Sequence, residues 1–297
     1  MAVKLGKRAA ALGRRRAAMA DDQRAALRSL VAAPKFELIP LKGALEAAQA
    51  LPDGATVTVT ASPSHGIEST IELAEQMVAR GHDAVPHLSA HMIRDRKHLT
   101  ELLDRCRASR FREAFVVGGD AKDPGEFHDG LSLLRAMDEL GHPFETIGAP
   151  SYPEGHPDIS RERLLDVLLE KQRYVSYTTT QMCFDPDAIV TWIAEMRRLG
   201  VTLAVHLGTP GVADMTKLLT ISARIGVAGS ARYLKKNKRM VGRLLTPGKF
   251  GPDALLEGVA PAIADPSAKI EALHVFTFNQ VAAMVEWQRQ MLASLDA

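Results

Sequence analysis

Eight short segments of β-strand composition recur along the chain, and their number and spacing constrain its fold most strongly. They are rich in Val, Thr, Ile and aromatic residues and occupy residues 36–40, 56–62, 83–89, 113–119, 145–151, 174–181, 203–209 and 274–279. Segments with the apolar spacing of helices lie between them, as in residues 71–78, 99–106, 131–140 and 189–196. Strands that alternate with helices pair in parallel through right-handed crossovers.

Eight such units in a chain of 297 residues predict one α/β domain, a single (β/α)8 barrel. The competing fold is a two-domain doubly wound sheet, which usually carries a GxGxxG turn after an early strand, and the sequence contains none. Residues 210–265 are more than one helix needs, so we expect extra helices between strands seven and eight. The expected division is a basic N-terminal arm or helical extension over residues 1–33 and a barrel over residues 34–297.

The start of the chain is basic and lacks acidic residues, with Lys4, Lys7, Arg8, Arg14, Arg15 and Arg16. A mitochondrial presequence has this composition, but the segment has no serine and continues into an amphipathic pattern over residues 21–31, which favours a solvated arm or helix. The net charge of +2 creates no field that would attract nucleic acid or membrane. The longest apolar runs fall short of the ~18 residues of a membrane span. We expect a cytoplasmic protein that binds neither nucleic acid nor membrane.

Metal and disulfide motifs are absent from the sequence. Cys106 and Cys183 do not form a CxxC pair, and the ten histidines show no HExxH or zinc-finger spacing. We therefore expect no metal site and a reducing compartment.

Polar residues cluster where the predicted strands end, which is where barrels of this kind carry their chemistry. These residues are Glu37, Thr60, His87, Asp120, Gln181, His206, Thr277 and Asn279, with Tyr152, Glu154 and His156 in the loop PSYPEGHPD at residues 150–158. Structural roles are the alternative. Glu37 could belong to an ion pair and Asp120 could be a turn or N-cap residue. Gln181 and the histidines could be core groups that hydrogen-bond to the backbone. Their shared position at one mouth predicts an enzyme with a small-molecule substrate.

The ordered motifs FELIP, PHLS, GGD, SYPEGHP, TTTQMCFD and HVFTFN resemble the methylenetetrahydrofolate reductase family over about residues 35–290. The most specific of them are SYPEGHP and TTTQMCFD. The family fold is a (β/α)8 barrel, in agreement with the count of strands. The resemblance implies reduction of 5,10-methylenetetrahydrofolate to 5-methyltetrahydrofolate by NADH or NADPH, with FAD as the family cofactor.

The resemblance also implies roles for individual residues. Glu37 would be the general acid that opens the folate ring to a 5-iminium cation, and burial favours the protonated carboxyl that this role needs. Asp120 would contact the pterin and stabilise the cation, and Gln181 would bind the pterin edge. We also assign Thr277 and Asn279 to the substrate site. The positions that would line the cofactor site are Thr60, His87, Gly118, Gly119, Tyr152 and His156.

Two departures from the family pattern concern the flavin. The family's RGD is GGD here, so Gly118 replaces an arginine that helps to hold FAD. The family lysine near strand six aligns with Glu170, and Lys171, one residue further, is predicted to point elsewhere. Each lost charge-assisted hydrogen bond is worth about 1.5–3 kcal/mol. These departures predict weak or absent FAD binding and direct hydride transfer from NAD(P)H to the folate iminium.

Alternative functions remain open at this stage. One is a pterin-dependent methyltransferase-like barrel, and another is a folate-binding or complex-forming homologue without turnover. The basic run at residues 233–239 suits a solvated helix face or a landing site for a folate polyglutamate tail. The apolar helix over residues 281–291 suits either packing on the barrel or a homo-oligomer interface.

Overall fold

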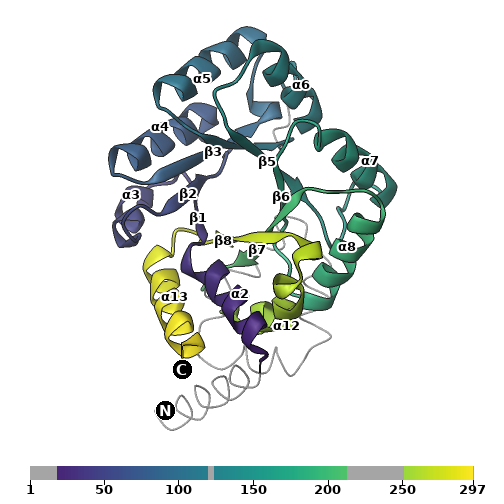
Figure 1. Cartoon of the computed structure of the whole chain (residues 1–297). Helices are drawn as coiled ribbons and strands as arrows, with labels where there is room; N and C mark the ends of the chain where they lie inside the picture. Colours follow the sequence, from purple (N-terminus) through teal and green to yellow (C-terminus); the bar gives the residue numbers. More distant parts are fainter. Residues whose placement is uncertain (1–18, 120–123, 213–250, 297) are drawn as a thin grey trace.

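The computed structural model describes residues 19–119, 124–212 and 251–296, and a closed barrel of eight parallel strands forms its centre. Each strand pairs with its neighbours in sequence, and β8 pairs with β1 to close the ring (Figure 1). The strands are β1 (Lys35–Leu38), β2 (Thr56–Val59), β3 (Asp83–Ser89), β4 (Glu113–Val117), β5 (Thr146–Ser151), β6 (Tyr177–Thr180), β7 (Ala204–Pro210) and β8 (Ile270–Phe276). The predicted (β/α)8 barrel is confirmed.

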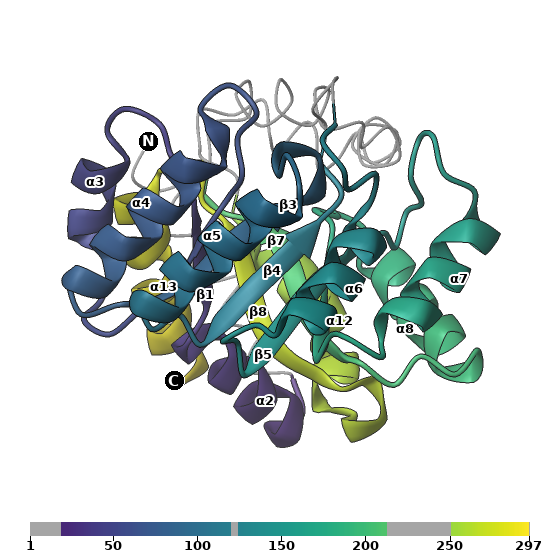
Figure 2. The same ribbon diagram turned by 90° about the horizontal axis from the view of Figure 1, so that it is seen from above.

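Helices surround the barrel on its outer side (Figures 1 and 2). They are α2 (Asp21–Ala32), α3 (Ala44–Ala47), α4 (Gly66–Ala79), α5 (Arg96–Ala108), α6 (Gly130–Leu140), α7 (Arg161–Lys171), α8 (Pro186–Arg198), α12 (Asp253–Ala264) and α13 (Val281–Leu295). Side chains at several helix starts satisfy free backbone donors. Asp95, Asp129 and Ser160 each accept a hydrogen bond from the backbone nitrogen three residues further on. The apolar stripes predicted for α4, α5, α6 and α8 face the strands and form the main core with them.

The position of the last strand differs from the prediction. β8 begins at Ile270 and ends at Phe276, whereas the predicted segment covered residues 274–279. The first half of β8 reads IEAL, which lacks the β-branched and aromatic density used to find strands, and its pairing with β7 contains a register shift at Val205/His206. The strand ends early because Phe278 and Asn279 have positive φ angles of 51° and 59°, which turn the chain away from the sheet.

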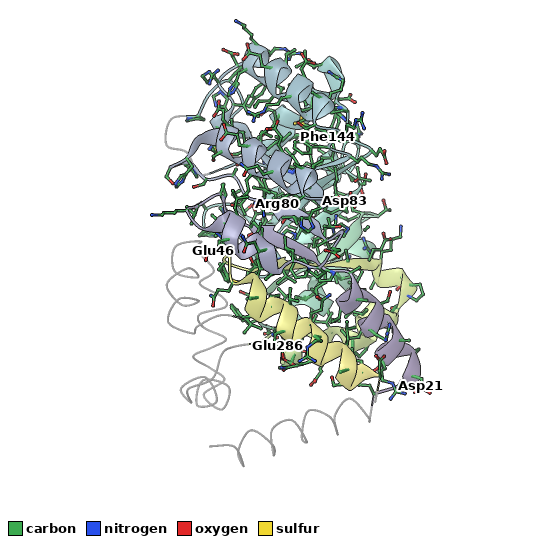
Figure 3. All side chains as sticks on the ribbon, turned by 90° about the vertical axis from the view of Figure 1, so that its left-hand side faces the viewer. Asp21, Glu46, Arg80, Asp83, Phe144 and Glu286 are labelled. Atoms are coloured by element: carbon green, nitrogen blue, oxygen red, sulfur yellow. The ribbon has the colours of Figure 1, made fainter. Side chains whose placement is uncertain are left out.

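The two ends of the described chain pack against each other beside β1. Figure 3 shows α2, which begins near Asp21, lying along α13, which carries Glu286. The Gln288 amide donates to the backbone oxygens of Val31 and Ala32. In Figure 2, α2 lies beneath the barrel, on the side where the strands begin. The helical extension predicted before the barrel is therefore present from residue 21, while the basic residues at positions 4–16 lie outside the described residues.

The connection from β7 to β8 is described only in part. One helix, α12, covers Asp253–Ala264 and packs on α2 and α8. Residues 213–250, with the basic run at 233–239, lie outside the described residues. The apolar residues of α13, including Val281, Met284 and Met291, are buried within the chain, so packing on the barrel accounts for them. None of the helices in the described ranges is long and apolar enough to cross a membrane.

Candidate active site

Glu37 lies on β1 at the inner side of the barrel and has a buried partner. Alternation along the strand places Phe36 and Leu38 in the outer core, so that Glu37 faces the barrel axis. The residue is 8% exposed, and its Oε2 atom lies 3.1 Å from Nε2 of His274 on β8. A carboxyl group buried among strands needs such a partner. Glu37 therefore has the buried partner that the structural alternative requires, and its catalytic role stays a prediction.

Thr277 and Asn279 follow β8 and hold the end of β1. The Thr277 hydroxyl donates to the backbone oxygen of Glu37 and accepts from the Asn279 nitrogen. The Asn279 amide accepts from the Ile39 nitrogen and donates to the Ile39 oxygen, at 2.9 Å each. These contacts give both side chains a positioning role next to Glu37. Their assignment to substrate binding stays a prediction.

Three histidines share the inside of the barrel with aromatic rings. The His87 ring lies 4.8 Å from Phe115 and 6.3 Å from His274 between centroids, and the His206 ring stacks on Tyr177 at 3.7 Å. Burial, with the nearby His274, lowers the pKa of His87 well below its usual value. Burial, with Lys35 and His274, does the same to the pKa of His206. Both imidazoles are therefore neutral at physiological pH. The sequence prediction put His87 in the cofactor site and missed His274, although His274 lies within the HVFTFN motif.

The end of β4 carries the two predicted glycines. Gly119 has φ of +97°, and a Cβ there would lie 2.1 Å from the Ser89 hydroxyl oxygen, so only glycine fits. A Cβ at Gly118 would meet nothing nearer than the Gly130 nitrogen at 3.9 Å. A Cβ at position 118 would therefore fit without displacing a neighbour among the described residues. Asp120 lies outside the described residues, and its catalytic role stays a prediction.

Lys171 corrects one prediction. It was expected to point elsewhere, with Glu170 in the position of the family lysine. Lys171 is instead 8% exposed, and its Nζ would lie 3.4 Å from a Cβ placed on Gly130, beside the end of β4. Glu170 faces outward and forms an ion pair with Arg135. A one-residue shift along α7 turns a side chain by about 100°, which explains the error.

The Lys171 ammonium is a buried cation without a hydrogen bond among the described residues. Burial lowers its pKa, and the charge of Asp129 partly opposes this effect. Because a buried ammonium is costly unless it is paired, this position suits a bound anion. The site thus keeps one of the two cations whose loss the sequence predicted.

The loop PSYPEGHPD is held to its neighbour. The ring of Tyr152 meets that of His156 edge-on at 5.1 Å, and Gly155 turns the chain with φ of +88°. The Cys183 thiol donates to the Glu154 carboxylate at 3.2 Å, which ties this loop to the one after β6. Burial, with the Glu154 charge, raises the pKa of Cys183, so the thiol stays protonated.

Gln181 and Thr60 lie at the ends of β6 and β2, as predicted. The Gln181 Oε1 atom accepts from the Met182 nitrogen at 2.8 Å, which leaves the NH₂ group free of partners in the described part of the chain. The Thr60 backbone nitrogen donates to Leu38, and its oxygen accepts from the Thr70 hydroxyl. Glu37 on β1 and His87 on β3 therefore lie inside the barrel, and Gln181 follows β6 at its mouth.

A separate pocket of about 210 Å³ opens between α7 and α8, beside the mouth rather than in it. Leu165, Leu168, Trp192 and Met196 form its apolar wall, and Lys171 lies at its edge. Among the residues that the structure describes, no group of three His, Cys, Asp or Glu side chains is arranged to hold a metal ion.

The fold and the mouth define a (β/α)8 barrel with a buried acid paired to a histidine. The chain belongs to the methylenetetrahydrofolate reductase family, whose sequence model matches residues 38–240. A curated relative is methylenetetrahydrofolate reductase 1 of Schizosaccharomyces pombe, 22% identical over 198 residues. That alignment covers 61% of this chain and 32% of the relative, so the chain spans about a third of the relative's length. The family match begins one residue after Glu37 and ends before β8.

Two solved structures are similar to this chain at low sequence identity. The dihydropteroate synthase of Xanthomonas albilineans is 14% identical with a TM-score of 0.44, covering 89% of this chain and 94% of its own. A putative phosphonomutase from Burkholderia cenocepacia J2315 is 15% identical with a TM-score of 0.41, covering 74% and 96%. At these scores neither structure bears on the function of this chain.

Proposed function

We propose that the protein reduces 5,10-methylenetetrahydrofolate to 5-methyltetrahydrofolate with a hydride from NADH or NADPH. The observation that carries this proposal is the Glu37–His274 pair, an acid buried at the inner face of a barrel whose sequence belongs to the reductase family. A module that only bound folate would have no need of a buried carboxyl at this place. The two alternatives with the same fold are a methyltransferase-like barrel and a binding subunit. No feature of the described residues favours either of them.

The proton chemistry falls to Glu37. The protonated carboxyl gives its proton to N10 of the folate, the bond between N10 and the methylene carbon breaks, and a 5-iminium cation forms. Asp120, one residue after the Gly118–Gly119 pair, would stabilise this cation by its negative charge. The hydride of NAD(P)H then adds to the methylene carbon, which becomes the methyl group. The Gln181 NH₂ group, which has no partner in the described part of the chain, would donate to an acceptor on the pterin.

The residues for a flavin fit only in part. Lys171 supplies a buried cation for a diphosphate, but Gly118 supplies no guanidinium, although a Cβ would fit there. A diphosphate also joins the two halves of NAD(P)H, so Lys171 suits that ligand equally well. We therefore propose that Tyr152, His156 and Lys171 contact the nicotinamide dinucleotide and that its hydride passes directly to the folate.

Two measurements on the purified full chain test this proposal. Anaerobic oxidation of NADH or NADPH should depend on added methylenetetrahydrofolate and should yield one methyl product per nicotinamide oxidised. The absorbance spectrum should show no stoichiometric flavin. A yellow protein whose activity disappears when FAD is stripped would refute direct transfer while leaving the reductase assignment intact. Folate binding without any nicotinamide oxidation would refute the reductase assignment itself.

A further inference from the structure

The interior of this barrel is polar where such barrels usually hold branched aliphatic side chains. Five polar atoms inside it are buried and have no hydrogen-bond partner among the described residues. They are Thr58 Oγ1, His87 Nε2, Ser89 Oγ, Thr179 Oγ1 and His206 Nδ1. All five side chains belong to residues that are more than nine-tenths buried. An unpaired buried group costs about 1–3 kcal/mol, and internal water is the usual way to satisfy it.

Strand register places these atoms around one axis. Thr58 pairs with Val85, which packs against Tyr177 inside the barrel. Thr179 pairs with His206, whose ring stacks on Tyr177. Paired residues of neighbouring strands face the same side of a sheet. These atoms therefore line the inside of the barrel rather than the layer beneath the helices.

The upper end of this set reaches the candidate acid. His87 and Ser89 alternate along β3, so both face the axis. The centres of the His87 and His274 rings lie 6.3 Å apart, so the two imidazoles are neighbours at this end of the set. His274 in turn lies 3.1 Å from the Glu37 carboxylate.

The lower end reaches the side where the strands begin. Lys35, the first residue of β1, forms an ion pair with Glu113, the first residue of β4. Their side chains are 13% and 18% exposed, so this end of the column contacts solvent. The Lys35 ammonium lies 4.6 Å from the centre of the Tyr177 ring, which stacks on His206.

We infer that this hydrated polar column carries protons from the N-terminal end of the barrel to Glu37, with His274 as the last relay, an inference that rests on the proposed reductase function. Each turnover consumes one proton, which passes from Glu37 to the folate. Pterin and nicotinamide fill the mouth during the reaction and keep bulk water from that side. A route through the barrel lets Glu37 regain its proton without the departure of either ligand.

The chemistry of the last step follows from the imidazole. His274 donates its Nε2 proton to the Glu37 carboxylate oxygen and takes a proton at Nδ1 from water in the column. The carboxyl is then protonated again, and the imidazole has changed tautomer without a net change of charge. The new proton arrives on Oε2, so the carboxyl rotates to present it to the substrate, and the imidazole returns to its first tautomer before the next turnover.

The other two histidines suit a relay because they are neutral. A neutral imidazole has one donor and one acceptor nitrogen and can pass a proton between waters. Burial keeps the pKa of His87 and of His206 well below its usual value. A proton therefore does not stay trapped on either ring. A trapped proton would stop the transfer.

Isosteric removal of the column hydroxyls tests the inference. The Thr58→Val, Thr179→Val double variant loses two unpaired hydroxyls and should fold as the natural chain does. We expect kcat to fall about tenfold with KM for the folate unchanged, and the solvent deuterium isotope effect on kcat to rise. His274→Gln keeps a donor for Glu37 but cannot relay a proton, and should lower kcat by about 100-fold with folate affinity retained.

Thr178→Val is the matched control. Thr178 is adjacent to Thr179 on β6, but its hydroxyl donates to the Ala149 oxygen outside the column, so kcat and the isotope effect should stay as they are. An active natural enzyme with a double variant of normal kcat and isotope effect overturns the column. An inactive natural enzyme overturns the proposed function instead. A high-resolution crystal structure decides independently of turnover, because a dry barrel interior overturns the column and ordered water on the five atoms supports it.

Discussion

The Asn279 side chain pairs with both backbone groups of Ile39, accepting from its nitrogen and donating to its oxygen, each at 2.9 Å. An amide that pairs with one residue in this way takes the place of a neighbouring strand. It extends the β1–β8 contact beyond the end of the ladder, because β8 stops at Phe276. The position of Glu37, two residues before Ile39, therefore depends on Asn279.

Asn279→Ala should destabilise the protein and also lower its turnover. Removing the amide leaves the Ile39 nitrogen without its partner, while the Ile39 oxygen keeps its bond from Leu41, and this should lower the free energy of unfolding by about 1–3 kcal/mol. Chemical denaturation measures this value, and kcat should fall below what the lost folded fraction explains. Asn279→Asp keeps the acceptor and loses the donor, so an intermediate effect is expected. Unchanged stability in both variants would contradict the positioning role.

Glu37→Gln should abolish most turnover and leave folate binding in place. The amide has almost the shape of the carboxyl but carries no acidic proton, so kcat should fall by about 100-fold or more. Steady-state kinetics and folate titration by fluorescence measure the two effects. Glu113→Gln, at the other end of the barrel, is a matched carboxyl change outside the mouth and should preserve ring opening in single-turnover experiments. A Glu37→Gln enzyme with normal kcat would remove Glu37 from the chemistry.

Lys171→Met should stabilise the free protein and weaken its binding of the dinucleotide. Replacing a buried ammonium that has no hydrogen bond by an apolar chain of similar length should raise the free energy of unfolding by about 1 kcal/mol or more. The lost cation should raise KM for NAD(P)H about tenfold or more. Lys97→Met, on the exposed face of α5, is the charge-matched control and should change neither quantity. Tighter dinucleotide binding by Lys171→Met would refute the assignment.

The same lysine predicts the pH dependence of both quantities. Burial lowers the pKa of Lys171 in the folded protein. Folding is therefore penalised below this lowered pKa, and the penalty shrinks as the pH rises from there towards the ordinary pKa of lysine. The stability gained by Lys171→Met should therefore be largest at neutral pH and shrink in alkaline solution. Dinucleotide affinity of the natural chain should fall over the same alkaline range, because the cation is lost. Calorimetry and nicotinamide titration between neutral and alkaline pH check both trends.

Gly118→Arg should fold and should increase flavin binding, whereas Gly119→Ala should lower the stability of the folded protein. Position 118 leaves 3.9 Å to the nearest atom for a Cβ, and position 119 leaves 2.1 Å with a positive φ. Melting temperature separates the two variants. Flavin absorbance after incubation with FAD and gel filtration measures the gain. If Gly118→Arg binds FAD no better than the natural chain, the missing guanidinium does not explain weak flavin binding.

The strand pattern of the sequence predicted the barrel, because period and residue type suffice to identify alternating strands and helices. The limits of β8 were wrong because IEAL has weak strand composition and gains its structure from pairing with β7. The prediction for Lys171 was wrong because an alignment error of one residue places a side chain on a different face of the helix. His274 could have been found from its alternation with Phe276 along one strand. Its contact with Glu37 depends on closure of the barrel, which no local pattern contains.

The closure of β8 onto β1 also sets the order in which the site can be assembled during synthesis. Glu37 leaves the ribosome early, whereas its partner His274 follows 237 residues later and Asn279 lies 240 residues beyond Ile39. Contacts so distant in sequence form late and slowly. A nascent chain therefore carries an unpaired carboxyl on β1 until β8 has been made. Truncation of the chain before β8 would remove the site as completely as loss of Glu37 itself.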